Sequence, residues 1–377
     1  MNDIVHRSSG ALADSTMLAD LTTIRVGGPA HELFRPTTEN ELVDTVRTVW
    51  QRGDHWLLIG GGSNMVVADE GFDGTVIHIA TRGIDVVSQD DNSLRIRVQA
   101  GEPWDRLVER LVARGWAGME ALSGIPGSVG AAPIQNIGAY GQEVSSALEG
   151  IDFLDYSSGK LVHLSTAELE LGYRTSVIKR GRVGVVVAAH FALTASPTST
   201  ARYQQLATAL SVNVGDEVPV QQVRDTVLAL RASKAMVLDP NEPDSVSCGS
   251  FFTNPIVPEN IARALPADAP RWVIDDEPVA DIVVPLGETP APPPPPKQRM
   301  VKLSAAWLIE HSGVPKGFRL PGSRAAVSTK HSLAIVNRTG ATAAEVSELS
   351  RYIAALVLSR YGIRLQPEPV AVGVELT

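Results

Sequence analysis

The stretch LSGIPGSVGAAPIQNIGAYGQ, residues 122–142, decides the fold because it is long, uncharged and unable to form regular structure. Its five glycines and two prolines exclude one continuous helix or a central strand. Ser, Gln and Asn interrupt it, so it is not a membrane span either. Irregular main chain near the interior leaves N–H groups that need partners, and a large ligand rich in acceptors can supply them. The segment is therefore interpreted as the wall of a cofactor cleft, although a Gly-rich crossover packed between two domains explains it equally well.

The composition describes a globular protein of more than one domain. A chain of 377 residues is too long for one ordinary core, so two or three domains are expected. Its 44% hydrophobic and 20% charged residues are typical of soluble proteins. The formal charge of −9 argues against nucleic acid or an anionic membrane as the main partner. The single cysteine, Cys248, excludes an intramolecular disulfide and favours a reducing compartment.

The N-terminal sequence and the histidines narrow the expectation further. MNDIVHRSSGALADSTM has no apolar core, so no secretory signal and no membrane insertion are expected. The eight histidines form neither an HExxH motif nor a tight His/Cys cluster, so no metal site is predicted. A cytoplasmic enzyme is the starting expectation.

Helices and strands alternate without a regular βαβ repeat, which favours the α+β class. Thr38 and Glu41 form a capping box ahead of one helical stripe. Thr342 and Glu345 form another ahead of the longest stripe. Helices are expected at 38–50, 104–114, 221–231 and 342–361, and strands at 56–59, 65–67, 76–79, 94–100, 151–156, 161–164, 183–193 and 370–376. The Pro/Ser/Thr-rich stretch 195–201 is interpreted as a linker at a domain boundary, and the five prolines of 291–297 as an exposed, extended loop.

The sequence Gly60-Gly61-Gly62-Ser63-Asn64 follows a predicted buried strand, as a phosphate-binding turn should. It is neither a Walker A loop nor a GxGxxG motif. Three successive glycines still allow their N–H groups to form a concave anion-binding nest. A tight turn between strands is the commoner explanation of such a motif by itself. Together with the uncharged wall, however, the nest suits a dinucleotide such as FAD.

Four polar residues are candidates for chemistry, and each has an ordinary alternative. Arg174, in GYRTS, can bind a carboxylate through two parallel hydrogen bonds, or be a surface arginine. Glu368, between two prolines, is a candidate acid or electrostatic anchor, or a solvated loop residue. Arg231 and Lys234 end a predicted helix, where helix-dipole pairing alone explains two cations.

The stretch SCGSFFTNP, residues 247–255, places hydroxyl, thiol and amide groups beside two aromatic residues. This arrangement suits a positioned proton donor next to a flat ring. No G-x-S-x-G elbow is present, so an α/β-hydrolase nucleophile is not expected. Cys248 is most simply a small buried hydrophobic residue.

Taken in order, these motifs resemble the UDP-N-acetylenolpyruvoylglucosamine reductases (the MurB family) of bacterial peptidoglycan synthesis. The resemblance spans nearly the whole chain, and the IPGSVG…PIQNIGAYG pair and GSFFTNP are its most specific parts. The matching segments are TIRVGGP (23–29), GGGSN (60–64), IPGSVG (125–130), PIQNIGAYG (133–141), GYRTS (172–176), GSFFTNP (249–255) and PE (367–368).

The resemblance implies an FAD-binding module of the vanillyl-alcohol oxidase type, made of two α+β subdomains, and a C-terminal α+β substrate-binding domain. The strand within 365–377 is expected to return to the active site. The expected domains are 1–80 for the first FAD subdomain, 81–230 for the second with a substrate loop around 196–215, and 231–377 for the substrate-binding domain with its Pro-rich loop at 290–297.

The resemblance also implies a reaction, the reduction of the enolpyruvyl ether of UDP-N-acetylglucosamine to UDP-N-acetylmuramate with NADPH. Flavin N5 would deliver hydride, and Ser250 would protonate the neighbouring carbon, with Cys248 as the local rival. Arg174 and Glu368 would polarise the substrate carboxylate and the developing enol. The residues expected to bind FAD are Gly60, Gly61, Gly62, Ser63, Asn64, Ile125, Pro126, Gly127, Gly130, Asn136, Gly138, Ala139 and Tyr140.

Family substrate contacts map onto Tyr203, Arg231, Lys234 and Asn254, and Tyr203 suggests the branch whose tyrosine loop closes over the UDP group. The loop 60–64 holds no His or Cys, so FAD is expected to be noncovalent. The protein is expected to be a monomer. Two features depart from the family pattern: a proline directly after Glu368, and a long segment 258–299 interpreted as an exposed loop. Two other functions stay open, an alcohol or sugar oxidase with the same FAD module and a nonenzymatic UDP-sugar-binding protein.

Overall fold

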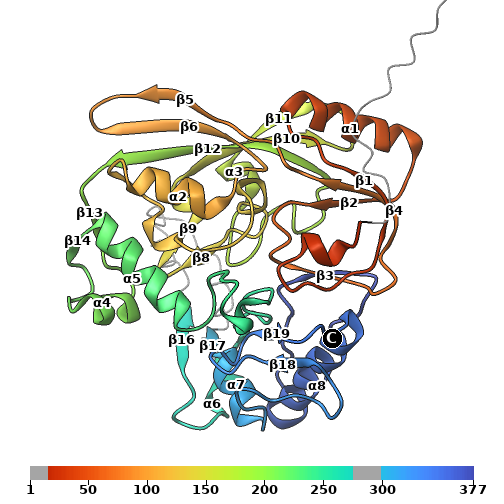
Figure 1. Cartoon of the computed structure of the whole chain (residues 1–377). Coiled ribbons are helices and arrows are strands. Elements are labelled where there is room, and N and C mark those ends of the chain that lie inside the picture. The colour runs from red at the N-terminus through yellow and green to blue at the C-terminus, as the bar shows by residue number, and fades with distance from the viewer. Residues whose placement is uncertain (1–15, 275–298) are drawn as a thin grey trace, which may run out of the picture.

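The computed structural model describes residues 16–274 and 299–377 (Figure 1). Residues 1–15 and the five-proline loop lie outside these ranges, so the expectations for the N-terminal sequence and for that loop are not tested. Within the described residues, no helix has the length and apolar character that crossing a membrane requires. Helices and strands are mixed throughout, as the sequence predicts for the α+β class.

A parallel three-stranded sheet with the order β1-β4-β2 comes first along the chain. Helix α1 connects β1 to β2, the first two strands along the chain. It begins after Thr38, which forms the predicted capping box with Glu41. Leu42, Val46 and Val49 of α1 are buried against both this sheet and the larger second sheet, so α1 joins the two. The bounds are β1 (Ala30–Phe34), α1 (Glu39–Arg52), β2 (Trp56–Ile59), β3 (Met65–Val67) and β4 (Phe72–His78), preceded by a 3-10 turn at Leu18–Leu21.

The second sheet is antiparallel, with the order β11-β10-β12-β6-β5 and the short β7 beside the end of β12. Helix α2 packs its apolar stripe, including Trp104 and Leu107, against this sheet (Figure 1). The bounds are β5 (Ile84–Gln89), β6 (Ser93–Gln99), α2 (Trp104–Val112), β7 (Trp116–Ala117), β10 (Leu148–Asp155), β11 (Leu161–Ser165), α3 (Thr166–Leu169) and β12 (Gly184–Ala195).

The glycine-rich stretch 122–142 forms no long element, which confirms the prediction from its composition. It begins at the end of the 3-10 turn Glu120–Leu122 and then contains the 3-10 turn Val129–Ala131 and the two-residue strand β8 (Gly138–Ala139), which pairs with β9 (Gln142–Glu143). It lies directly against the end of β6, because a Cβ on Gly130 would come 2.5 Å from Cβ of Ala100, the residue that follows this strand.

The interpretation of residues 195–201 as a linker is wrong, because most of this segment is strand. Strand β12 continues to Ala195, and β13 (Thr198–Thr200) pairs with β14 (Glu217–Pro219). The Ser/Thr composition suggested an extended, exposed segment, but Thr is also a strand former, and Ala201 is fully buried beneath the pair. This hairpin carries α4 (Gln204–Leu210) and α5 (Val220–Ala232), the second of which matches the predicted helix 221–231.

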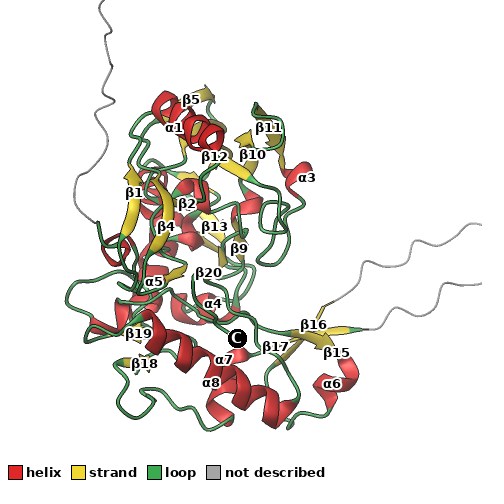
Figure 2. Ribbon diagram, turned by 90° about the vertical axis from the view of Figure 1, so that its right-hand side faces the viewer, coloured by secondary structure: helices red, strands yellow, loops and turns green. Residues whose placement is uncertain are grey.

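The C-terminal region packs α7 and α8 against a three-stranded sheet of order β15-β17-β16 and the pair β18-β19 (Figure 2). Helix α8 has the predicted capping box at Thr342 and ends at Gly362. The described part of 258–299 contains α6 and β16, so its interpretation as an exposed loop is wrong there. The bounds are β15 (Ile256–Pro258), α6 (Glu259–Arg263), β16 (Arg271–Ile274), β17 (Met300–Leu303), α7 (Ala305–His311), β18 (Ala325–Val327), β19 (Ile335–Asn337) and α8 (Ala343–Tyr361).

Two sets of contacts join the N-terminal and C-terminal regions. Strand β20 (Val370–Val372), shorter than the predicted 370–376, pairs in parallel with β3 of the N-terminal region. The Asp69 carboxylate accepts the main-chain N–H groups of Ala343 and Ala344 at the start of α8, at 2.8 and 3.0 Å. The N-terminal and C-terminal regions are therefore fixed to one another. The domain limits remain predictions.

Candidate active site

A cavity of about 730 Å³ lies between the N-terminal sheets and the C-terminal region. Its wall combines glycine-rich main chain with a few charged side chains, which come from segments far apart in the sequence. The lining includes residues 60–65, 125–128, 130–132, 134–135 and 137–140, with Arg174, Lys179, Tyr203, Gln205, Arg231, Lys234, Cys248, Ser250, His331 and Glu368.

Two glycine loops form one side of the cavity by direct contact of their main chains. An added Cβ on Gly61 would lie 2.6 Å from Cα of Gly127. Ser63 donates its hydroxyl to the Pro126 carbonyl at 3.1 Å, which joins the loops further. The main-chain N–H groups of Gly61, Gly62 and Ser63 donate to no other described residue, so they are available to an acceptor-rich ligand. A concave run of free N–H groups is what a pyrophosphate requires, so the residues fit FAD.

The predicted cofactor residues line this cavity with one exception. Asn136 lies below the wall, where its amide donates to Glu143 Oε2 at 2.7 Å and to the Gly172 carbonyl at 3.2 Å. Its Oδ1 accepts the N–H of Ser145 at 3.1 Å, so the side chain is occupied within the protein. Asn136 therefore shapes the wall and does not face the cavity. The sequence motif could not separate these two roles, because both require a fixed turn.

Arg174 and Glu368 meet at the cavity as an ion pair, with Arg174 Nε 3.3 Å from Glu368 Oε1. The guanidinium also donates to the carbonyl of Gly138 at 2.9 Å, which fixes it against the wall. The proline after Glu368 does not withdraw the carboxylate from the site, because the main-chain N–H of Glu368 donates to the Phe251 carbonyl at 2.9 Å. Nearby, burial lowers the pKa of Lys179, while Glu368 opposes the shift and Arg174 adds to it.

The Ser250 hydroxyl has one side-chain partner among the described residues, His331, with Ser250 Oγ 3.4 Å from His331 Nε2. Burial, together with the charges of Lys234, Lys316 and Arg231, lowers the pKa of His331 to about 4. His331 is therefore neutral near pH 7. No sequence motif marked this histidine, because its role depends on a contact between residues 81 positions apart.

Cys248 also lines the cavity but is chemically quiet. Its Sγ donates to the Met65 carbonyl at 3.2 Å, and burial raises the pKa of the thiol to about 12. A buried neutral thiol is a poor nucleophile and a weak acid. This agrees with the interpretation of Cys248 as a small hydrophobic residue.

Two cations approach the cavity from the end of α5. Arg231 is partly buried, and burial lowers its pKa although Tyr140 and Asp105 oppose the shift. Its guanidinium donates to the Met236 carbonyl at 2.7 Å, while its Nε has no partner among the described residues. Lys234 reaches Gln205 Oε1 at 3.2 Å. Leaving an arginine Nε buried and unpaired is unfavourable, so an anionic ligand would complete this group.

Tyr203 lies at the mouth of the cavity and Asn254 lies away from it. Tyr203 is 44% exposed, and its ring forms an edge contact with that of Tyr140, with ring centroids 6.1 Å apart. Asn254 Oδ1 instead accepts the N–H of Ala305 at 3.0 Å, at the start of α7. Of the four predicted substrate residues, Asn254 is therefore absent from the described lining. Lys179, Gln205 and His331 also line the cavity, although the sequence motifs do not identify them as site residues.

Comparisons with known proteins cover both halves of the chain. Residues 30–165 match the FAD binding domain family, and residues 240–372 match the C-terminal domain of UDP-N-acetylenolpyruvoylglucosamine reductase. The UDP-N-acetylenolpyruvoylglucosamine reductase of Leifsonia xyli subsp. xyli is 54% identical, over 97% of this chain and 100% of the relative. The Thermobifida fusca enzyme of the same name is 46% identical, over 97% and 99%. The crystal structure of UDP-N-acetylenolpyruvylglucosamine reductase (MurB) from Thermus caldophilus matches with a TM-score of 0.63 and 25% identity, over 96% of this chain and 99% of that one.

Proposed function

Because the chain belongs to the UDP-N-acetylenolpyruvoylglucosamine reductase family, whose members are FAD-containing oxidoreductases of peptidoglycan synthesis, we propose that it reduces the enolpyruvyl ether of UDP-N-acetylglucosamine with NADPH. The observation that carries the proposal is the joint presence of Ser250, the Arg174–Glu368 pair and Arg231, whose buried Nε has no partner among the described residues, in one glycine-walled cavity. Bound FAD would supply the hydride-transfer chemistry between NADPH and the substrate. The free N–H groups of Gly61, Gly62 and Ser63 would hold its pyrophosphate.

Arg174 stabilises the charge that develops during reduction. Hydride addition to the vinyl carbon places negative charge on the neighbouring carbon, and that charge spreads into the substrate carboxylate. The Arg174 guanidinium is fixed by Gly138 and Glu368, so it is oriented before the charge appears. Glu368 thus acts as the residue that positions Arg174, and Lys179 adds a second cation at the same wall.

Ser250 donates the proton to the neighbouring carbon. A serine is a weak acid, so its placement and its partner matter more than its pKa. His331 is neutral near pH 7, and in the tautomer that carries hydrogen on Nε2 it donates to Ser250 Oγ. This hydrogen bond directs the serine hydrogen away from the histidine and stabilises the oxygen as its proton leaves.

Arg231, Lys234 and Tyr203 would bind the UDP part of the substrate. The two cations supply positive charge for a diphosphate in a protein whose formal charge is −9. Tyr203, exposed beside Tyr140, is free to cover the ligand. We also propose that FAD is noncovalent and that the enzyme is a cytoplasmic monomer. Acid precipitation should release all of the FAD, and light scattering should give the mass of one chain.

The test of the proposal is Ser250→Ala, followed in each half-reaction by anaerobic stopped-flow absorbance. Bleaching of the yellow protein by NADPH should keep its wild-type rate. Reoxidation by UDP-N-acetylenolpyruvoylglucosamine should slow by about 10²–10⁴-fold, the usual effect of losing a positioned acid. Cys248→Ser is the matched control and should turn over normally. Unchanged reoxidation in Ser250→Ala would reject the serine as the proton donor.

The same assay separates the two other functions that the sequence leaves open. An oxidase with this module would be reoxidised rapidly by oxygen and slowly by the UDP substrate. A nonenzymatic binding protein would be colourless, or would fail to bleach with NADPH.

A further inference from the structure

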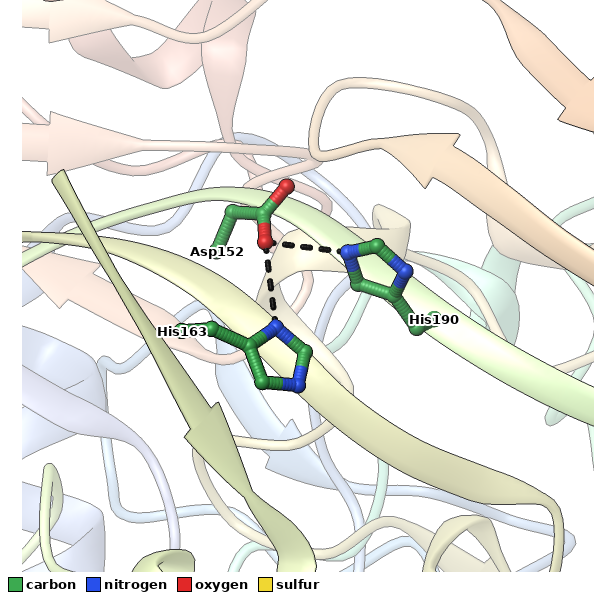
Figure 3. A group of neighbouring side chains, drawn as sticks. All are labelled: Asp152, His163 and His190. Atoms are coloured by element: carbon green, nitrogen blue, oxygen red, sulfur yellow. Dashed lines mark hydrogen bonds and ion pairs between the residues drawn. The ribbon is translucent and has the colours of Figure 1, made fainter. Parts of the chain in front are cut away.

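A second cluster of polar side chains lies on the large sheet, outside the lining of the cavity. Asp152 of β10, His163 of β11 and His190 of β12 project from three neighbouring strands and point toward one another (Figure 3). Asp152 Oδ1 lies 3.2 Å from His163 Nδ1 and 2.9 Å from His190 Nε2. One ligand atom from each of the three residues lies within 4.8 Å of the others.

The strand register brings these residues together. Asp152 is directly opposite His163 in the β10–β11 pair, while His190 is opposite Gly150 in the β10–β12 pair. Gly150 leaves the space that the His163 ring uses, since an added Cβ there would lie 2.6 Å from His163 Nε2. The three side chains therefore share one face of the sheet. On the central strand β10, Gly150 has no side chain and so leaves room between the two histidines.

From this geometry we propose that Asp152, His163 and His190 form a binding site for a zinc-like divalent transition metal ion. Bonds of about 2.1 Å to a tetrahedral ion place neighbouring ligand atoms about 3.4 Å apart, close to the two Asp–His distances. Asp152 and His190 are held, with side chains 17% and 21% exposed, whereas His163 is 52% exposed and free to adjust. Water would complete the coordination.

The surrounding charges leave one oxygen of Asp152 for an ion. Arg97 Nε donates to Oδ2 of Asp152 at 2.7 Å, so Oδ1 is the oxygen that faces the histidines. Arg97 is shared with Glu39 of α1, at 2.8 Å, so the two carboxylates outweigh the single guanidinium. Burial acts to raise the pKa of Asp152, but hydrogen bonds from Arg97 and both histidines outweigh it and lower that pKa. The carboxylate is therefore charged at neutral pH.

The donor set selects the class of ion. Two imidazoles and one carboxylate suit Zn²⁺, Ni²⁺ and Cu²⁺. Ca²⁺ takes six to eight oxygen ligands and Mg²⁺ keeps an octahedral oxygen shell, so neither should bind here. Since the ion would connect β10, β11 and β12 away from the cavity, binding should stabilise the sheet without supplying any part of the reduction.

The test is calorimetric titration of the chelator-treated FAD holoenzyme with Zn²⁺ at neutral pH. One saturable equivalent is expected, with Mg²⁺ and Ca²⁺ giving no heat of binding. His163→Ala removes the most exposed ligand and should weaken Zn²⁺ binding by roughly tenfold or more, because even the loss of an outer-shell partner typically costs about 10–100-fold. His31→Ala, which removes an exposed histidine outside the cluster, should leave binding unchanged.

A second variant tests whether weaker Zn²⁺ binding results from loss of a ligand and not from misfolding of the His163→Ala protein. Asp152→Asn keeps an oxygen for the histidines but loses the negative charge, and should also weaken binding. FAD absorbance and thermal unfolding without Zn²⁺ verify that each variant is folded. Added Zn²⁺ should raise the unfolding temperature of the wild type and His31→Ala only. The proposal is rejected if wild-type binding is not saturable at one equivalent, or if His163→Ala binds Zn²⁺ as tightly as the wild type.

Discussion

The contact between the two glycine loops predicts a large effect from one methyl group. In Gly61→Ala the new Cβ would lie 2.6 Å from Cα and 2.9 Å from the carbonyl carbon of Gly127, inside the ordinary 3.4–4 Å of van der Waals contact. Both atoms belong to main chain, so no side chain can rotate away. The φ of Gly61 is not positive, so the alanine adds a clash without left-handed strain. The two loops must therefore separate.

The free protein can relieve this clash by opening the loops, but FAD binding must close them again. Overpacking of this kind typically costs about 1–3 kcal/mol. At roughly 1.4 kcal/mol per factor of ten, the dissociation constant of FAD should rise by about 5- to 150-fold. Quenching of FAD fluorescence, titrated with apoprotein, measures this constant directly.

Gly115→Ala is the control for general destabilisation. Gly115 has a φ of 76° and no neighbouring atom within 4 Å of an added Cβ. Alanine there strains the main chain at the end of α2 by about 1 kcal/mol without approaching the cavity, so it should lower the unfolding temperature and preserve FAD affinity. The reasoning about the loops fails if Gly61→Ala binds FAD as tightly as Gly115→Ala does.

Three further predictions concern stability and reactivity. Cys248, buried and with its pKa raised to about 12, should resist thiol reagents at neutral pH until the protein is denatured, as measured by thiol titration. Asp69→Ala removes the acceptor at the start of α8 and should lower the free energy of unfolding by about 1 kcal/mol, with faster amide exchange in that first turn. Hydrogen bonding, first from Ser157, lowers the pKa of Asp155 from 3.8 to about 2, so its stabilising effect is present above pH 3.8 and lost as pH falls toward 2. The stability difference between wild type and Asp155→Asn should shrink over that interval in denaturant titrations.

Local signals allowed much of this fold to be predicted. A capping box needs only residues three positions apart, so the starts of α1 and α8 were evident before any tertiary contact was known. The glycine loops were equally evident, because close main-chain contact requires glycine whatever the partner. The segment 195–201 differs from its prediction because a Ser/Thr-rich stretch is equally compatible with a loop and with a strand, and only pairing with β14 decides between them.

The sequence does not predict which groups the individual side chains contact. Asn136 and Asn254 belong to the motifs that carry the family resemblance, yet each amide satisfies main-chain groups of the protein itself. The converse holds for His163 and His190, which lie 11 and 38 positions from Asp152 and meet it only through strand register. A histidine count along the chain therefore says little about metal binding in a β-sheet, where register determines the neighbours.

Asn64 shows why the two halves of the cavity must assemble together. Its Nδ2 donates to Gln135 Oε1 at 2.9 Å and to the main-chain carbonyl of Glu368 at 3.1 Å. One amide thus joins the glycine nest, the uncharged wall and the segment that carries Glu368, across a separation of 304 residues. Directly beyond it, β3 pairs with β20, so the main chain fixes the same alignment. Because Glu368 in turn pairs with Arg174, the position of the Arg174 guanidinium in the cavity depends on the loop that would hold FAD.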